Sequence, residues 1–99
     1  MSYHNDATER LFRAILSLQT MEECHRFFED ACTVREILDI AQRFEVAGML
    51  ADKKSYQTIT KETGMSTATI SRVNRCLTYG SGGYRLALDR TKENTANDD

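Results

Sequence analysis

The side chains best suited to bind another molecule lie close together in this sequence, between positions 53 and 75. Small hydroxyl and methyl side chains come first in the densest part, and two arginines follow at helical spacing. Small side chains let the N-terminal end of a helix approach DNA base edges, and the backbone N–H groups there can meet phosphate. Residues predicted to contact DNA from this helix are Ser66, Thr67, Ala68, Ser71, Arg72 and Arg75.

Two short helices must position these side chains. Ser55 is expected to begin a helix over residues 56–63, and Gly64 to end it in a left-handed conformation. Ser66 is expected to begin the next helix, from Thr67 to about Leu77. The helices would touch through apolar side chains, which are Ile59, Met65, Ile70 and Val73. This spacing predicts a helix-turn-helix, and it leaves open an ordinary helical hairpin with a glycine turn.

The net charge of −2 is unevenly distributed along the chain. Residues 1–52 carry five basic and ten acidic side chains, residues 53–92 carry eight and two, and residues 93–99 add three acids, giving −5, +6 and −3. The basic block can meet a polyanion, and Lys53, Lys54 and Lys61 are predicted to touch the DNA backbone beside the groove. The charge pattern alone also fits a solvated basic face without a partner.

The whole chain is predicted to be all-α, with six helices in a single domain over residues 1–99. Its parts are N-terminal helices over 7–52, a helix-turn-helix over 55–77, a C-terminal helix over 83–91 and a flexible acidic tail over 92–99; residues 1–6 are expected to be loose. The first two helices carry much apolar surface for their length, in Leu11, Phe12, Ile15, Leu16, Phe27 and Phe28. We therefore expect a homodimer formed through this half.

Several classes of protein are not indicated. No stretch approaches the roughly 20 apolar residues that span a bilayer, and no signal peptide is recognisable, so we expect a cytoplasmic protein without a membrane partner. Cys24, Cys32 and Cys76 lack ligand spacing, which favours reduced thiols over a metal site. No set of residues suggests catalysis, so we do not expect an enzyme.

Two parts of the sequence resemble the Trp repressor family. Residues 68–72 (ATISR), followed by Leu77, resemble its recognition helix. Residues 33–36 (TVRE) with 41–43 (AQR) resemble the start of its long central helix. Two further runs are similar to the YerC/YecD group of Trp-repressor-like proteins from Gram-positive bacteria, residues 54–56 (KSY) and 63–75 (TGMSTATISRVNR). The resemblance spans about residues 7–92.

This resemblance implies a six-helix, intertwined homodimer whose two recognition helices face successive major grooves of a palindromic operator. It implies base-edge contacts from Thr67, Ala68 and Thr69. Gln57, Thr60 and Ser71 would support these contacts. Gln57 and Thr60 stand where the Trp repressor has cations, so the operator should differ.

The resemblance also implies a pocket for a small-molecule effector. Arg72 and Arg43 fall on the two arginines that hold the co-repressor, with Val73 and Cys76 beside them. Val73 replaces a glycine and would intrude on a flat aromatic ligand, which argues against tryptophan.

The function predicted from the sequence is therefore a sequence-specific double-stranded DNA-binding transcriptional regulator, a repressor that acts without tryptophan. A helix-turn-helix module that binds protein instead of DNA is the alternative.

Overall fold

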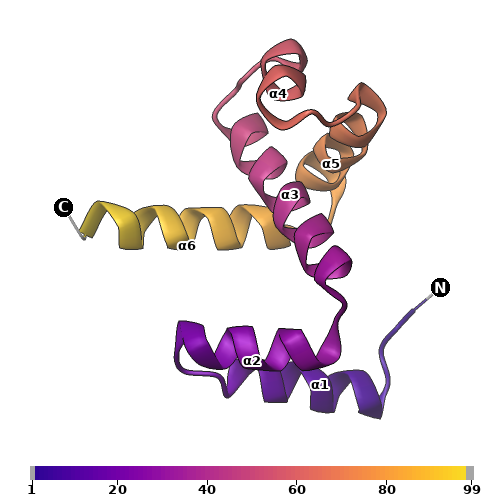
Figure 1. Ribbon diagram of the computed structural model, residues 1–99, viewed down its shortest axis with the longest axis vertical. Helices are drawn as coiled ribbons and strands as arrows, with labels where there is room; N and C mark the ends of the chain where they lie inside the picture. Colours follow the sequence, from indigo (N-terminus) through magenta and orange to yellow (C-terminus); the bar gives the residue numbers. More distant parts are fainter. Residues whose placement is uncertain (1, 98–99) are drawn as a thin grey trace. The chain divides into compact units, whose positions relative to one another are not determined.

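The computed structural model describes residues 2–97, with side chains described to residue 92. These residues form six helices, which confirms the predicted all-α class (Figure 1). The helices are α1 (Asp6–Leu16), α2 (Met21–Ala31), α3 (Val34–Ala51), α4 (Tyr56–Thr63), α5 (Thr67–Tyr79) and α6 (Gly83–Asn97). The chain divides into two compact units, Met1–Ile37 and Leu38–Asp99, and the boundary falls inside α3.

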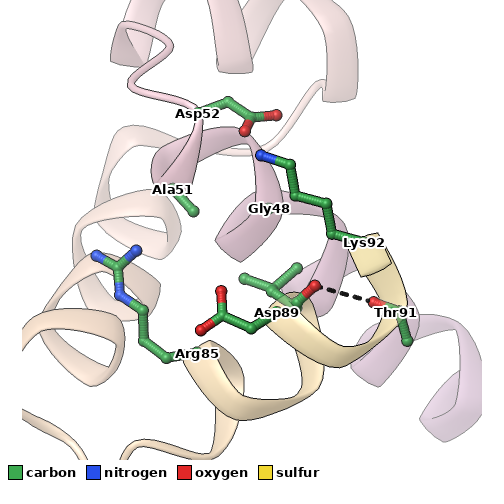
Figure 2. A pocket seen from close by; sticks show the side chains of 8 residues that line it. Gly48, Ala51, Asp52, Arg85, Asp89, Thr91 and Lys92 are labelled. Carbon is green, nitrogen blue, oxygen red and sulfur yellow. Dashed lines mark hydrogen bonds between the residues drawn. The ribbon is translucent and has the colours of Figure 1, made fainter. Parts of the chain in front are cut away.

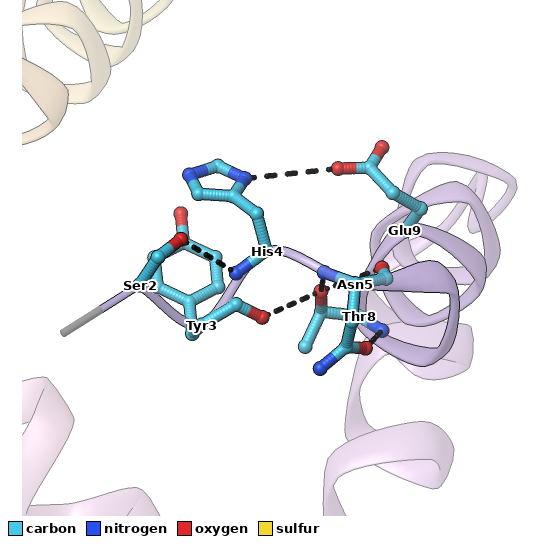
Figure 3. Close-up of polar contacts among 6 residues, drawn as sticks. All are labelled: Ser2, Tyr3, His4, Asn5, Thr8 and Glu9. Atoms are coloured by element: carbon cyan, nitrogen blue, oxygen red, sulfur yellow. Dashed lines mark hydrogen bonds and ion pairs between the residues drawn. The ribbon is translucent and has the colours of Figure 1, made fainter.

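In the first unit, the start of α1 is fixed by a network of polar contacts (Figure 3). Asn5 caps the helix because its Oδ1 accepts the Thr8 N–H at 2.9 Å, while the Asn5 N–H donates to Thr8 Oγ1 at 3.0 Å. The same Thr8 hydroxyl donates to the Tyr3 carbonyl, and the Tyr3 ring meets Phe12 edge-on. Residues 3–5 are thus tied to α1, and the expectation that they are loose is wrong.

Threonine caps begin α2 and α3. The Glu23 N–H donates to Thr20 Oγ1 at 3.1 Å, although the Glu23 carboxylate accepts from the Gln19 N–H instead of closing a reciprocal capping box. Thr33 and Glu36 do form the reciprocal box, with bonds of 2.8 and 3.1 Å. These caps satisfy N–H groups that a helix start otherwise leaves unpaired.

Neither α1 nor α2 contains a buried side chain, although both are strongly amphipathic. Leu16 is 83% exposed, Met21 75% and Val34, at the start of α3, 73%. Each large apolar side chain left in water forgoes about 1.5–3 kcal/mol that burial would supply. The described part of the first unit therefore presents apolar faces that it does not cover itself.

The second unit has a small, fully buried core. Val46 and Ala47 from α3 meet Ile59 from α4 and Ile70 and Val73 from α5. Partly buried apolar side chains surround this core, namely Met49, Leu50, Tyr56, Met65, Tyr84 and Leu88. The close approach of α6 to α3 occurs at Gly48, where a Cβ atom would lie 3.4 Å from Leu88 Cδ2.

Two helices run further than the sequence pattern indicates. α5 ends at Tyr79 instead of near Leu77, and Gly80 is its C-cap in an extended conformation. Glycine suits this cap because a Cβ at that position would overlap the Cys76 carbonyl oxygen. α6 continues to Asn97, so residues 92–97, expected in a loose tail, are helical. Residues 98–99 of that expected tail lie outside the described residues.

The Thr33–Glu36 box predicts a pH dependence of stability. The hydrogen bond from the Thr33 backbone lowers the pKa of the Glu36 carboxyl, and a side-chain bond with Thr33 lowers it further. Stability from this bond is present above the ordinary carboxyl pKa and is lost as the pH falls through the lowered value. Glu36→Gln keeps an acceptor but cannot titrate, so its acid-induced loss of helix, followed by circular dichroism, should be smaller. Identical acid profiles for both proteins would contradict this.

Candidate nucleic-acid interface

α4 and α5 begin in the same way. The Thr58 N–H donates to Ser55 Oγ at 3.1 Å, and the Thr69 N–H donates to Ser66 Oγ at 3.2 Å. In both caps the threonine hydroxyl also pairs with the serine hydroxyl, at 2.9 and 3.1 Å. Both predicted N-caps are therefore present, and each fixes the start of its helix to one residue.

The turn between the helices depends on Gly64. This residue has φ +75° and ψ 3°, in the left-handed region that favours glycine, and its N–H donates to the Thr60 carbonyl at 2.8 Å. Thr63 supports the turn from both sides, since its hydroxyl donates to the Ile59 carbonyl and accepts the Met65 N–H. The chain thus turns sharply from α4 into α5.

Burial divides α5 into two faces. Ile70, Val73 and Leu77, three and four residues apart, are buried against the rest of the second unit. The predicted contact residues on this helix lie on the other side and are exposed: Thr67, Ala68, Ser71, Arg72 and Arg75. α5 contains two arginines and no acidic residue, so its outer face is suited to a polyanion.

The remaining predicted contact residues differ in how accessible they are. Gln57, Lys61, Lys53 and Ser66 are exposed, and Thr69 is half-buried with its hydroxyl paired to Ser66. Lys54 is exposed too, but its Nζ lies 3.2 Å from Glu62 Oε2 in an ion pair.

Thr60 is the predicted contact residue least able to reach DNA. Thr60 as a whole is half-buried, and its hydroxyl oxygen is buried without a hydrogen-bond partner among the described residues.

Lys53 has an unusual backbone. Its φ of 65° makes it the one described non-glycine residue with positive φ, and it is the second residue after the end of α3. Its N–H donates to the Leu50 carbonyl at 2.9 Å, and the next N–H donates to Met49. A left-handed residue with these hydrogen bonds is a common way to end a helix. It fixes the backbone at Lys53 and so the direction in which the side chain starts.

A hollow of about 260 Å³ lies between α3 and α5. Arg43 and Arg72, predicted as a pair, both line it with Val73, and Cys76 does not. Asp39 and Gln42 from α3 and Met65 and Thr69 complete the lining. The sequence did not indicate Asp39 or Gln42, although Asp39 lies one helical turn before Arg43. No ion pair is present for either arginine among the described residues.

A larger hollow of about 360 Å³ lies between α3 and α6 and was not predicted (Figure 2). Asp52, Arg85, Asp89 and Lys92 contribute two charges of each sign to its lining. Charges of both signs give no preference for an anion or a cation. Among the described residues no group of histidine, cysteine, aspartate and glutamate is arranged to hold a metal ion.

Comparison with known proteins identifies the family. The sequence model of the family described as Trp repressor protein matches residues 6–92. The chain belongs to the Trp repressor family. Its members are non-enzymatic regulators, and this membership confirms the prediction that the protein is not an enzyme.

Individual relatives agree with this assignment. The chain is 59% identical over 85 residues to the Bacillus subtilis (strain 168) protein YerC, covering 86% of this chain and 82% of YerC. A TrpR-like protein from Eubacterium eligens is 53% identical, with a TM-score of 0.85 over 89% of this chain and 91% of that one. A Staphylococcus aureus protein is 48% identical, with a TM-score of 0.85 over 90% of this chain and 89% of that one.

The fold of the chain agrees with the family assignment. Like the two solved relatives, the chain has an all-α, six-helix fold. None of its helices, within the described residues, is long and apolar enough to cross a bilayer.

The orphaned hydroxyl of Thr60 predicts a stabilising substitution. Thr60→Val keeps the shape of the side chain and removes the buried group, so the free energy of unfolding should rise by about 1 kcal/mol. Denaturant unfolding at one fixed protein concentration measures it. Thr60→Ser, which keeps the hydroxyl, is the control and should show no gain. A loss of stability in Thr60→Val would mean that the hydroxyl does have a partner.

Proposed function

We propose that this protein is a homodimeric, sequence-specific regulator of transcription that binds double-stranded DNA through α4 and α5 and acts as a repressor in the cytoplasm. The observation that supports this most is the outer face of α5. There an exposed, acid-free surface with two arginines follows a helix start made of small side chains. Membership of the Trp repressor family supports the same function.

In the proposed complex, α5 enters the major groove with its N-terminal end. Thr67, Ala68 and Thr69 would contact base edges, and Ser71 and Gln57 would support them, in part through water. Thr60 contributes least because its hydroxyl is buried.

Arg72, Arg75 and the lysines would bind phosphates, which position the protein and add affinity without sequence preference. Of these, Lys53 and Lys61 are exposed cations, whereas Lys54 must first leave Glu62. Exposed ion pairs of this kind are weak, at about 0–1 kcal/mol, so the exchange costs little.

A second copy of the chain would cover the apolar faces of α1 and α2. These helices bury no side chain of their own, and Leu16 and Met21 are largely exposed. An intertwined dimer places these faces against the partner, and its two-fold symmetry predicts a palindromic operator.

The hollow between α3 and α5 would hold any small-molecule effector. Arg43 and Arg72 line it and would bind an anionic group, while Thr69 and Arg72 connect it directly to the helix proposed to read DNA. Val73 is 2% exposed and forms part of the core as well as the lining, so it cannot move aside for an indole ring without opening the core.

Arginine substitutions test the DNA-binding surface. On a duplex enriched from random sequence, Arg72→Ala or Arg75→Ala should weaken binding about tenfold. Each lost phosphate contact should also reduce the slope of log K against log salt concentration, in magnitude, by about 0.9. Arg10→Ala is the matched control, since Arg10 is an exposed arginine in α1. If both α5 variants bind like the control, the proposed surface is wrong. Binding that is insensitive to salt would favour the protein-binding alternative.

Tryptophan should have no effect on this protein. Because Val73 fills the place where a flat ring would lie, we expect the affinity for the enriched duplex to change less than twofold when tryptophan is added. A fluorescence anisotropy titration with and without the amino acid measures this. A tenfold or greater gain in affinity would contradict the steric argument and place tryptophan in the hollow.

A further inference from the structure

Tyr79 is the most exposed of the large apolar or aromatic side chains in the described residues, at 84%. The sequence pattern predicts that the helix ends near Leu77, but α5 includes Tyr79 as its last residue. It therefore lies one helical turn beyond Arg75, on the face opposite Ile70, Val73 and Leu77.

The chain around Tyr79 leaves its ring uncovered. Gly80 ends the helix, and Ser81, Gly82 and Gly83 follow, so side chains are nearly absent on the C-terminal side. Gly82 has φ +90°, and its carbonyl accepts the Leu86 N–H as α6 begins. A large molecule can thus approach the ring from the direction in which the helix points.

Helix length decides what such a molecule meets at this end. From Thr67 to Tyr79 the helix rises about 18 Å, at roughly 1.5 Å for each residue. The major groove is only about 8.5 Å deep and 12 Å wide. If α5 enters the groove with its N-terminal end, as proposed above, its last turn lies at the rim of the groove, where the sugar–phosphate backbone runs.

We propose that Tyr79 binds the DNA backbone at the rim of the groove, its hydroxyl donating to a phosphate oxygen and its ring lying against the adjacent deoxyribose. This rests on the proposed DNA-binding function. Charge favours DNA as the occupant, because Arg72 and Arg75 share the face and α5 holds no acid that would attract a basic protein. Tyrosine hydroxyls are among the ordinary donors to phosphate, and such contacts position a protein without reading sequence.

The experiment measures affinity for a duplex enriched by the wild-type protein and for a scrambled duplex. Tyr79→Phe removes only the hydroxyl and should weaken binding to both by a similar factor, about 5- to 30-fold for two symmetric copies; Tyr79→Ala should weaken it more. The salt dependence should stay unchanged, since no charge is lost, whereas Arg75→Ala should reduce it. Tyr3→Phe, the same change at an exposed tyrosine in the first unit, should bind like wild type.

Single methylphosphonate substitutions then locate the contact. Replacing one phosphate at the edge of a half-site should weaken wild-type binding and leave Tyr79→Phe unaffected. The proposal is overturned if both Tyr79 variants bind like wild type, or if no phosphate position shows this coupling. These results differ from failure of the proposed function, in which the wild-type protein itself enriches no duplex.

Discussion

The candidate interface depends on one apolar contact, where α4 and α5 pack together on α3. Ile59, Ile70 and Val73 meet Val46 and Ala47 there and are almost fully buried. Because so few side chains make this core, each contributes a large share of the free energy that holds α5 with its arginine face outward. The left-handed Gly64 makes the contact geometrically feasible, since it turns the chain within three residues between the two helices.

The same small core limits what the protein can do alone. It stabilises the second unit, but the described residues of α1 and α2 have no comparable core. Our proposal that a second copy covers their apolar faces links stability to function, because the symmetry that would bury these faces would also pair the two copies of α5. Val73 shows a related link at the hollow, where one side chain serves as core and as wall.

Local features were predictable from the sequence. The caps at Ser55 and Ser66 are both predicted and both present, since a cap involves residues only three apart. The helix ends were less predictable. α5 extends to Tyr79, and the close approach of its C-cap Gly80 to the Cys76 carbonyl is visible only in three dimensions.

Features that require two elements were predicted only in part. The family resemblance indicated that Arg43 and Arg72 face the same hollow, but not that Asp39 and Gln42 join them or that Cys76 stays out of it. Their places are set by how α3 packs on α5, which no pattern along one helix reveals. The buried hydroxyl of Thr60 is a similar case, since its environment comes from tertiary packing.

The most direct test of the central claim is selection of bound duplexes from a random-sequence pool by the purified protein at physiological salt. The account predicts a palindromic motif whose half-sites are about one helical turn, roughly 10 base pairs, apart. Failure to enrich any sequence would contradict it, as would a motif without two-fold symmetry.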